Sequence, residues 1–149
     1  MNIELCKAEI KRHEGEVLEI YMDSLGYKTL GVGHLCQPSD PEYNWEVGTP
    51  VTQEVVDMYY KDDFEKHYKE TIHVFGSEED FENLPEPIQR VLVNMCFNLG
   101  GTRLSKFRNM LKACREHNWK EMAKQMEDSR WFGQVGRRSK ELQDIVLGV

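Results

Sequence analysis

The chain has 149 residues, of which 40% are hydrophobic and 30% are charged, and its formal net charge is −7. A chain of this length can fold as one unit that buries about two-thirds of the surface of its extended form. No apolar run approaches the roughly 20 residues that a bilayer-spanning helix needs, so we expect no membrane insertion.

The first 34 residues are predicted to form a helix and a β-hairpin. Apolar residues at helical spacing indicate a helix over residues 3–12, which Gly15 ends, so that Glu14 lies at its C-terminal edge. A strand, a turn and a returning strand are predicted at residues 17–22, 23–26 and 27–32. Such a hairpin can bring Glu14, Asp23 and Thr29 to one side of a cleft.

These three side chains fit the hydrolysis of a glycosidic bond. That reaction needs an acid for the leaving oxygen and a second carboxylate near the other face of the sugar. Glu14 is the better candidate for the acid, because it lies at the more enclosed junction of helix and hairpin. Asp23 would stay ionised and orient a water or stabilise positive charge, and the Thr29 hydroxyl can hold that water. From the residues alone, an ordinary hairpin that happens to carry a Glu, an Asp and a Thr is the alternative.

The spacing of the three residues resembles a known catalytic motif. The motif of phage-type (T4-type) lysozymes, glycoside hydrolase family 24, is a Glu, eight residues, an Asp, five residues and a Thr. The chain matches it with Glu14, Asp23 and Thr29. Neighbouring residues match as well, among them Gly15, Gly26-Tyr27 and residues 31–35. Further matches to the central helix and the C-terminal part of the family lie at residues 92–100, 129–131 and 137–138. The resemblance covers nearly the whole chain in the order of the family.

The resemblance implies a role for each catalytic position. Glu14 is expected to be the general acid of an inverting reaction, in which Asp23 and Thr29 position the attacking water. Arg138 matches an arginine that pairs with the catalytic glutamate across the cleft.

The resemblance also implies residues that bind substrate or support the site. The positions expected to bind saccharide are Leu35, Phe97, Asn98, Gln125 and Arg138. His34 and Asp63 match a structural ion pair, so His34 is expected to be a scaffold residue. Two departures concern the surroundings: the loop between His34 and Thr52 is shorter than in the best-known phage member, and His13 stands where that member has an acid.

The rest of the chain is predicted to be mainly helical. Residues 37–50 contain three prolines and few periodic apolar residues, which predicts a surface loop. Thr52 is predicted to cap a helix that runs towards Ile72. Residues 76–80 are predicted to be a charged loop, which lacks the ligand pattern of an EF-hand. Further helices are predicted over residues 86–99, near residues 107–114, after a capping Asn118 with Glu121, and near residues 142–146.

We therefore predict an α+β, lysozyme-like fold with two lobes in one domain, residues 1–149. A small lobe of about residues 13–60 carries the hairpin. The larger helical lobe comprises residues 1–12 and about 75–149, and a helix over about residues 52–73 connects the two. The resemblance places the active-site cleft between the lobes.

No cofactor or metal is expected. Gly31-Val32-Gly33 follows a strand but lacks the remaining residues of a dinucleotide fingerprint. His67 and His73 are six residues apart, which does not place them on one helix face for a metal. The four cysteines (Cys6, Cys36, Cys96 and Cys114) show no metal-type clustering, and we expect reduced thiols, with one or two disulfides as the alternative.

The charge is distributed unevenly. Residues 101–149 hold 11 Lys and Arg against 6 Asp and Glu, whereas residues 1–100 hold 8 against 20. The basic C-terminal part can face an acidic polymer locally, and a solvated helical surface without a partner is an equal alternative.

The sequence predicts a muramidase that hydrolyses the β-1,4 bond between N-acetylmuramic acid and N-acetylglucosamine in bacterial peptidoglycan. A lytic transglycosylase on the same polymer and an inactive glycan-binding homologue are the alternatives. We expect a monomer that binds no nucleic acid. Because Met1 leads almost directly into a charged helix, no classical signal peptide is visible. We therefore expect synthesis in the cytoplasm and action on the cell wall after release.

Overall fold

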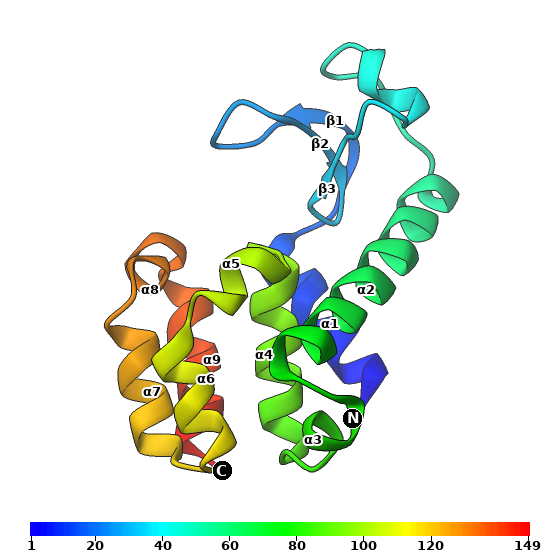
Figure 1. Cartoon of the computed structure of the whole chain (residues 1–149). Coiled ribbons are helices and arrows are strands. Elements are labelled where there is room, and N and C mark those ends of the chain that lie inside the picture. The colour runs from blue at the N-terminus through cyan, green and yellow to red at the C-terminus, as the bar shows by residue number, and fades with distance from the viewer. The chain divides into compact units, whose positions relative to one another are not determined.

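The structure, a computed structural model, describes residues 1–149 and combines one small sheet with a mainly helical remainder (Figure 1). This confirms the predicted α+β class. The chain divides into two compact units. We call residues 7–66 the sheet unit, and residues 1–6 together with 67–149 the helical unit.

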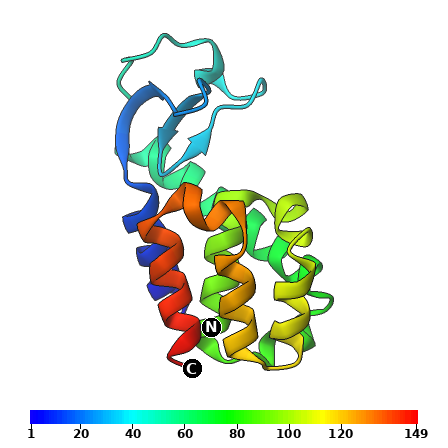
Figure 2. The ribbon, with the colours of Figure 1, turned by 90° about the vertical axis from the view of Figure 1, so that its left-hand side faces the viewer.

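The sheet unit contains three antiparallel strands in the order β1-β2-β3 (Figure 2). Their bounds are Val17–Met22 for β1, Lys28–Gly31 for β2 and His34–Leu35 for β3. Helix α1 (Ile3–Glu14) precedes them and ends where Gly15 takes a φ of +77°. The predicted returning strand was too long, and β3 was not predicted. Gly31 and Gly33, with φ of +60° and +62°, turn the chain from β2 into β3 within four residues.

One face of the sheet packs on helix α2 (Gln53–Phe75). The buried cluster of this unit consists of Ile20, Leu30, Val32, Cys36, Val51, Val56 and Tyr59. Thr52 caps α2 as predicted, because its Oγ1 accepts a hydrogen bond from the backbone N–H of Val55 at 3.2 Å.

The loop between β3 and α2 is more ordered than predicted. It contains a 3-10 helix, η1 (Pro41–Asn44), whose Glu42 is buried and accepts a 2.6 Å hydrogen bond from the Tyr59 hydroxyl. Lys28 donates from Nζ to the carbonyl oxygens of Tyr43 and Trp45, at 3.2 and 2.6 Å. These contacts join the loop to β2 and α2.

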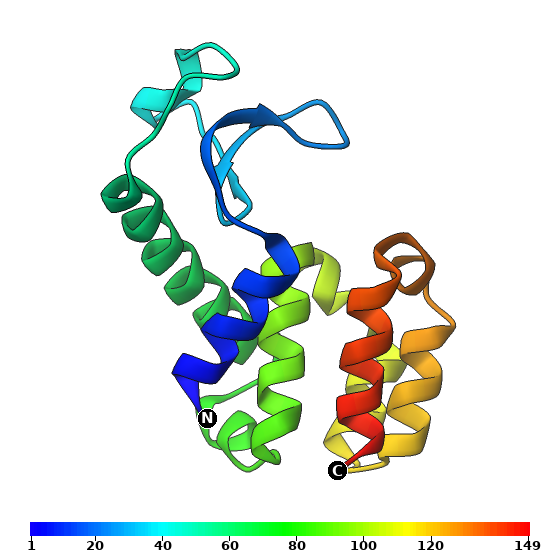
Figure 3. The same ribbon diagram turned by 180° about the vertical axis from the view of Figure 1, so that it is seen from behind.

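The helical unit contains seven complete helices. They are α3 (Glu78–Glu82), α4 (Glu86–Leu99), α5 (Gly101–Ser105), α6 (Arg108–Arg115), α7 (Trp119–Glu127), α8 (Arg130–Val135) and α9 (Arg137–Leu147). Helix α4 has the bounds that its periodicity predicts, and most of its side chains are buried. Helix α9 packs against α4, α7 and α8 (Figure 3), and α4 is the helix with the most buried side chains.

The prediction of a charged loop at residues 76–80 was wrong in part, because α3 begins at Glu78. Ser77 caps this helix, since its Oγ accepts a hydrogen bond from the backbone N–H of Asp80 at 3.1 Å. The acidic residues of the first turn then lie at the positive end of the helix dipole, where they are favourable. At Asn118 the predicted cap is confirmed: its Oδ1 accepts from the backbone N–H of Glu121 at 3.2 Å.

All four cysteines are buried thiols, and no disulfide joins them. None of the helices combines the length and the apolar composition required to cross a membrane.

Candidate active site

Glu14 lies at the last position of α1, where its half-buried side chain meets the turn between β2 and β3. A Cβ atom placed on Gly33 would lie 2.6 Å from Oε1 of Glu14, well inside any normal contact. The carboxylate therefore occupies the space that a side chain at position 33 would need. Glycine is the only residue type at position 33 that permits both this close approach and a φ of +62° without strain.

Asp23 organises the turn between β1 and β2. Its Oδ1 accepts hydrogen bonds from the backbone N–H groups of Leu25 and Tyr27, at 2.9 and 2.8 Å. The backbone N–H of Asp23 donates in turn to the carbonyl oxygen of Tyr27 at 2.9 Å. One carboxylate oxygen is thus held by the turn, and Oδ2 remains for other contacts.

Thr29 lies at the centre of the sheet, paired with Tyr21 of β1 on one side and Leu35 of β3 on the other. Directly opposed residues of antiparallel strands project to the same face. Tyr21, Thr29 and Leu35 therefore form a row on the face opposite the α2 core. Thr29 is 4% exposed and donates its hydroxyl hydrogen to the carbonyl oxygen of Tyr27 at 3.0 Å. Leu35 is 44% exposed at the end of the row.

Tyr21 is a residue of this site that the sequence analysis missed. Its pKa is raised, first by burial and then by the negative charges of Glu14 and Asp23. The charges of both carboxylates thus reach the phenol of Tyr21, and Tyr21 is paired directly with Thr29 in the sheet. The only signal in the sequence was the strand alternation, which does not show where Glu14 points.

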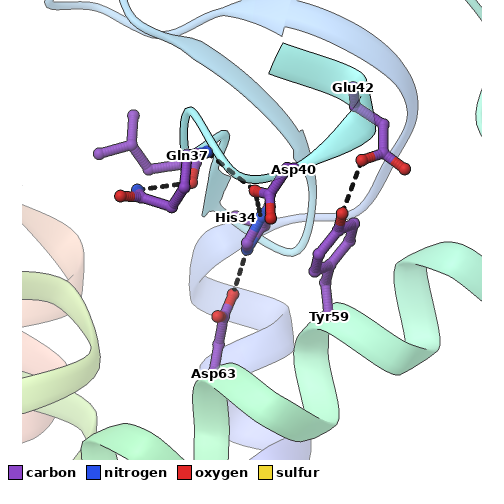
Figure 4. A network of polar contacts seen from close by, with 7 residues as sticks. His34, Gln37, Asp40, Glu42, Tyr59 and Asp63 are labelled. Atoms are coloured by element: carbon purple, nitrogen blue, oxygen red, sulfur yellow. Dashed lines mark hydrogen bonds and ion pairs between the residues drawn. The ribbon is translucent and has the colours of Figure 1, made fainter.

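His34 lies between two carboxylates, those of Asp63 and Asp40 (Figure 4). Its Nδ1 lies 2.7 Å from Asp63 and its Nε2 lies 2.8 Å from Asp40. Its ring stacks on Tyr59 with centroids 3.9 Å apart. Asp40 also accepts from the backbone N–H of Gln37 at 2.8 Å, so the network fixes the chain that follows Leu35.

The network changes the titration of its members. Burial alone lowers the pKa of His34, but hydrogen bonds and charge attraction from Asp63 and Asp40 outweigh it, so the pKa is raised. Burial alone raises the pKa of Asp40, and the Gln37 N–H and His34 outweigh it, so that pKa is lowered. Both shifts favour a charged pair at mildly acidic pH.

In the helical unit, the four residues expected to bind saccharide have different surroundings. Phe97 is buried and its ring meets the edge of His67, with centroids 5.1 Å apart. Asn98 accepts a hydrogen bond from the indole N–H of Trp131 at 2.7 Å. Arg138 is buried and donates from Nε to Oδ1 of Asn94 at 2.9 Å.

The fourth residue, Gln125, lines a pocket of about 680 Å³ within this unit. Trp131, the partner of Asn98, lines it as well. Basic side chains dominate its charged lining, which consists of Arg103, Lys106, Arg108 and Arg130 against Asp128 alone. The pocket thus concentrates positive charge in a chain whose net charge is negative.

The structure brings together Glu14, Asp23, Thr29 and Leu35 in the sheet unit, and it connects Asn98 and Gln125 through the pocket of the helical unit. The two groups belong to different units. Arg138 is expected to pair with Glu14, and this pairing between residues of the two units stays a prediction.

Comparison with known proteins shows the family and several relatives of the chain. Residues 11–144 match the family model described as phage lysozyme. The probable T4-type lysozyme 2 of Dictyostelium discoideum is 30% identical, over 89% of this chain and 88% of that protein. The probable T4-type lysozyme 1 of the same organism is 27% identical, over 94% and 92%. The pre-baseplate central spike protein Gp5 of Enterobacteria phage T4 is 28% identical, over 93% of this chain but 27% of that protein.

The α+β fold and these matches define a lysozyme-type glycosidase, a hydrolase with cell-wall lytic function. The chain belongs to the phage lysozyme family.

Proposed function

We propose that this protein is a muramidase that hydrolyses the β-1,4 bond between N-acetylmuramic acid and N-acetylglucosamine in peptidoglycan. Glu14 is the general acid, and Asp23 and Thr29 position the attacking water on an inverting path. The observation that carries the proposal is the arrangement in the sheet unit: the Glu14 carboxylate fills the space beside Gly33, and Asp23 and Thr29 are joined through the backbone of Tyr27.

The hydrogen bonds of Asp23 and Thr29 define how a water would be held. Thr29 already donates its hydrogen to the Tyr27 carbonyl, so towards a water it acts as an acceptor. Asp23 uses Oδ1 for two backbone N–H groups, which leaves Oδ2 as a second acceptor. A water that donates both hydrogens to these oxygens points its lone pairs at the anomeric carbon. Asp23, as a carboxylate, then receives the proton that this water loses.

Glu14 supplies the other proton. It protonates the glycosidic oxygen as the bond to the anomeric carbon breaks, and water completes the reaction with inversion at that carbon. The row of Tyr21, Thr29 and Leu35 provides a face along which a sugar can lie, with the exposed Leu35 at its end.

The helical unit supports an anionic glycan as the substrate. Peptidoglycan carries carboxylates on its muramic acid and on its peptides, and the basic lining of the pocket at Gln125 complements them. Phe97, Asn98 and Gln125 are the proposed saccharide contacts of this unit. We further propose that the protein acts as a monomer on the wall after release from the cytoplasm.

The test is the clearing of purified peptidoglycan by wild type and by Glu14→Gln, with the masses of the released products recorded. Glu16→Gln is the matched control, because Glu16 lies two residues away and forms only a surface ion pair with Lys11. We expect clearing by wild type and by the control, none by Glu14→Gln, and products with reducing ends.

Each other outcome selects an alternative. Products lighter by one water would identify a lytic transglycosylase, which forms an anhydro sugar. Saturable glycan binding without clearing by any of the three proteins would identify an inactive binding homologue. Wild-type clearing by Glu14→Gln would remove Glu14 from the chemistry.

A further inference from the structure

His67, Glu70 and Cys96 form a cluster in the helical unit that the proposed hydrolysis does not use. Each offers one metal-ligand atom, and the three atoms all lie within 4.8 Å of one another. His67 and Glu70 lie on successive turns of α2, three residues apart, and Cys96 lies on α4. We propose that this cluster is a binding site for a transition-metal ion of the zinc type.

The ligand chemistry selects the class of metal. A thiolate and an imidazole are soft or borderline ligands that favour Zn²⁺ and Co²⁺, whereas Mg²⁺ and Ca²⁺ prefer sites made of oxygen alone. Cys sulfur, His nitrogen and Glu oxygen are all ligands that Zn²⁺ accepts, and zinc sites with three protein ligands hold a water at the fourth tetrahedral position.

The geometry requires only small movements. In a tetrahedral zinc site the ligand atoms lie about 2.0–2.3 Å from the metal, and therefore roughly 3.3–3.8 Å from one another. His67 Nδ1 and Glu70 Oε1 share a hydrogen bond of 2.6 Å, so a metal would replace the proton between them, separate the two atoms slightly and draw the sulfur of Cys96 inward. The displaced proton and the thiol proton of Cys96 are released to solvent when the metal binds.

The surroundings hold the three ligands in place. Cys96 is 0% exposed, in the most buried helix of the unit. The ring of His67 packs edge-on against Phe97, which fixes its orientation. A Cβ placed on Gly101 would lie 3.0 Å from Oε2 of Glu70, so the start of α5 closes over the carboxylate. Ligands that are positioned before binding lose little entropy when the metal arrives.

A metal here would crosslink two helices. It would join the C-terminal part of α2 to the centre of α4, both within the helical unit, and a ligand that binds only the folded state raises the melting temperature. None of the three ligands is a proposed catalytic or saccharide-binding residue, although His67 packs against Phe97, a proposed saccharide contact.

The first test is titration of the reduced, metal-free protein with Co²⁺, followed by absorption spectroscopy. We expect binding of one ion per chain with a near-ultraviolet charge-transfer band from sulfur to cobalt, and displacement of that band by Zn²⁺. Cys96→Ser should abolish the band. Cys114→Ser is the matched control, since Cys114 is an equally buried thiol on α6 outside the cluster, and it should retain the band.

A second pair of variants keeps the thiol intact and separates metal binding from misfolding. His67→Gln should weaken Zn²⁺ binding at least about tenfold, whereas His73→Gln, an exposed histidine on the same helix, should leave it unchanged. Saturating Zn²⁺ should raise the Tm of wild type by roughly 5 °C and that of His67→Gln by less. Absence of a charge-transfer band in wild type, or equal Zn²⁺ affinity in wild type and His67→Gln, would overturn the proposal.

Discussion

Gly33 and the carboxylate of Glu14 lie so close that a Cβ atom at position 33 would be 2.6 Å from Oε1 of Glu14. The position of the proposed acid therefore depends on a glycine that contributes no chemistry. Because Gly33 also has a φ of +62°, a substitution there has two separable effects: backbone strain and displacement of Glu14.

Gly33→Ala should reduce turnover at least about 100-fold, since displacement of a catalytic group by about 1 Å has an effect of that order. Strain alone should lower stability by about 1–2 kcal/mol. Gly48→Ala is the control, because Gly48 has a φ of +91° but its Cβ would meet only Glu19, at 3.9 Å. Peptidoglycan clearing and thermal unfolding should show similar destabilisation in both variants and lost turnover in Gly33→Ala alone. Equal turnover in the two variants would show that Glu14 does not need the space beside Gly33.

Asp23 has a structural role and a proposed catalytic one, and two substitutions separate them. Asp23→Asn keeps an Oδ1 that accepts from Leu25 and Tyr27, so stability should stay near that of wild type. Asp23→Ala removes both hydrogen bonds and should lower stability by about 1–2 kcal/mol. Clearing should fall about 100-fold in both, because neither side chain can take a proton from water. If Asp23→Asn clears peptidoglycan at the wild-type rate, the residue serves only the turn.

The proposed role of the Thr29 hydroxyl can be tested with a side chain of the same shape that lacks the oxygen. Thr29→Val keeps the volume but removes the oxygen that would accept from the water, so turnover should fall at least about tenfold. The Tyr27 carbonyl still accepts from the backbone N–H of Asp23 in this variant, so the turn should persist. Thr29→Ser restores the hydroxyl and should recover most of the activity in the same clearing assay. Loss of activity in the serine variant as well would point to packing at this buried position as the cause.

Some elements follow from the sequence because local signals agree. Helix α4 has its predicted bounds, since an unbroken apolar stripe lies between Pro87 in the first turn and the terminating Gly100. The strand β1 has its predicted bounds too, and its β-branched and aromatic residues precede a turn with Asp23 and Gly26.

Other elements were missed because they are too short to show a period. Strand β3 has two residues, and helices α3 and α5 have five each. Their positions depend on contacts with distant parts of the chain, such as the pairing of Leu35 with Thr29. A hydrophobic pattern cannot report such contacts over so few residues.

In the candidate site, too, local features could be predicted from the sequence and features that depend on distant contacts could not. The spacing of Glu14, Asp23 and Thr29 could be read directly from the sequence, because the motif is local. The involvement of Tyr21 and the space beside Gly33 could not, because both depend on the direction in which the Glu14 side chain points. Strand alternation fixes a face but not the side chain that approaches it from another element.

The network around His34 should make the stability of the sheet unit depend on pH. The pKa of His34 is raised above its ordinary 6.5 by Asp63 and Asp40 against the opposing effect of burial. Its contribution is therefore complete below pH 6.5 and is lost as the pH rises through the raised value. The pKa of Asp40 is lowered from its ordinary 3.8, so its contribution is complete above pH 3.8 and is lost as the pH falls through the lowered value.

Between pH 4 and 6.5, roughly, both contributions are present, and removal of the network should be most costly there. His34→Asn should lower Tm by several degrees in this window, and the difference from wild type should shrink as the pH rises above it. His73→Gln changes an exposed histidine outside the network and should show no such profile. Thermal unfolding at half-unit steps of pH measures both. A Tm difference that stays constant from pH 5 to 9 would mean that His34 stabilises the unit by its stacking on Tyr59 rather than by its charge.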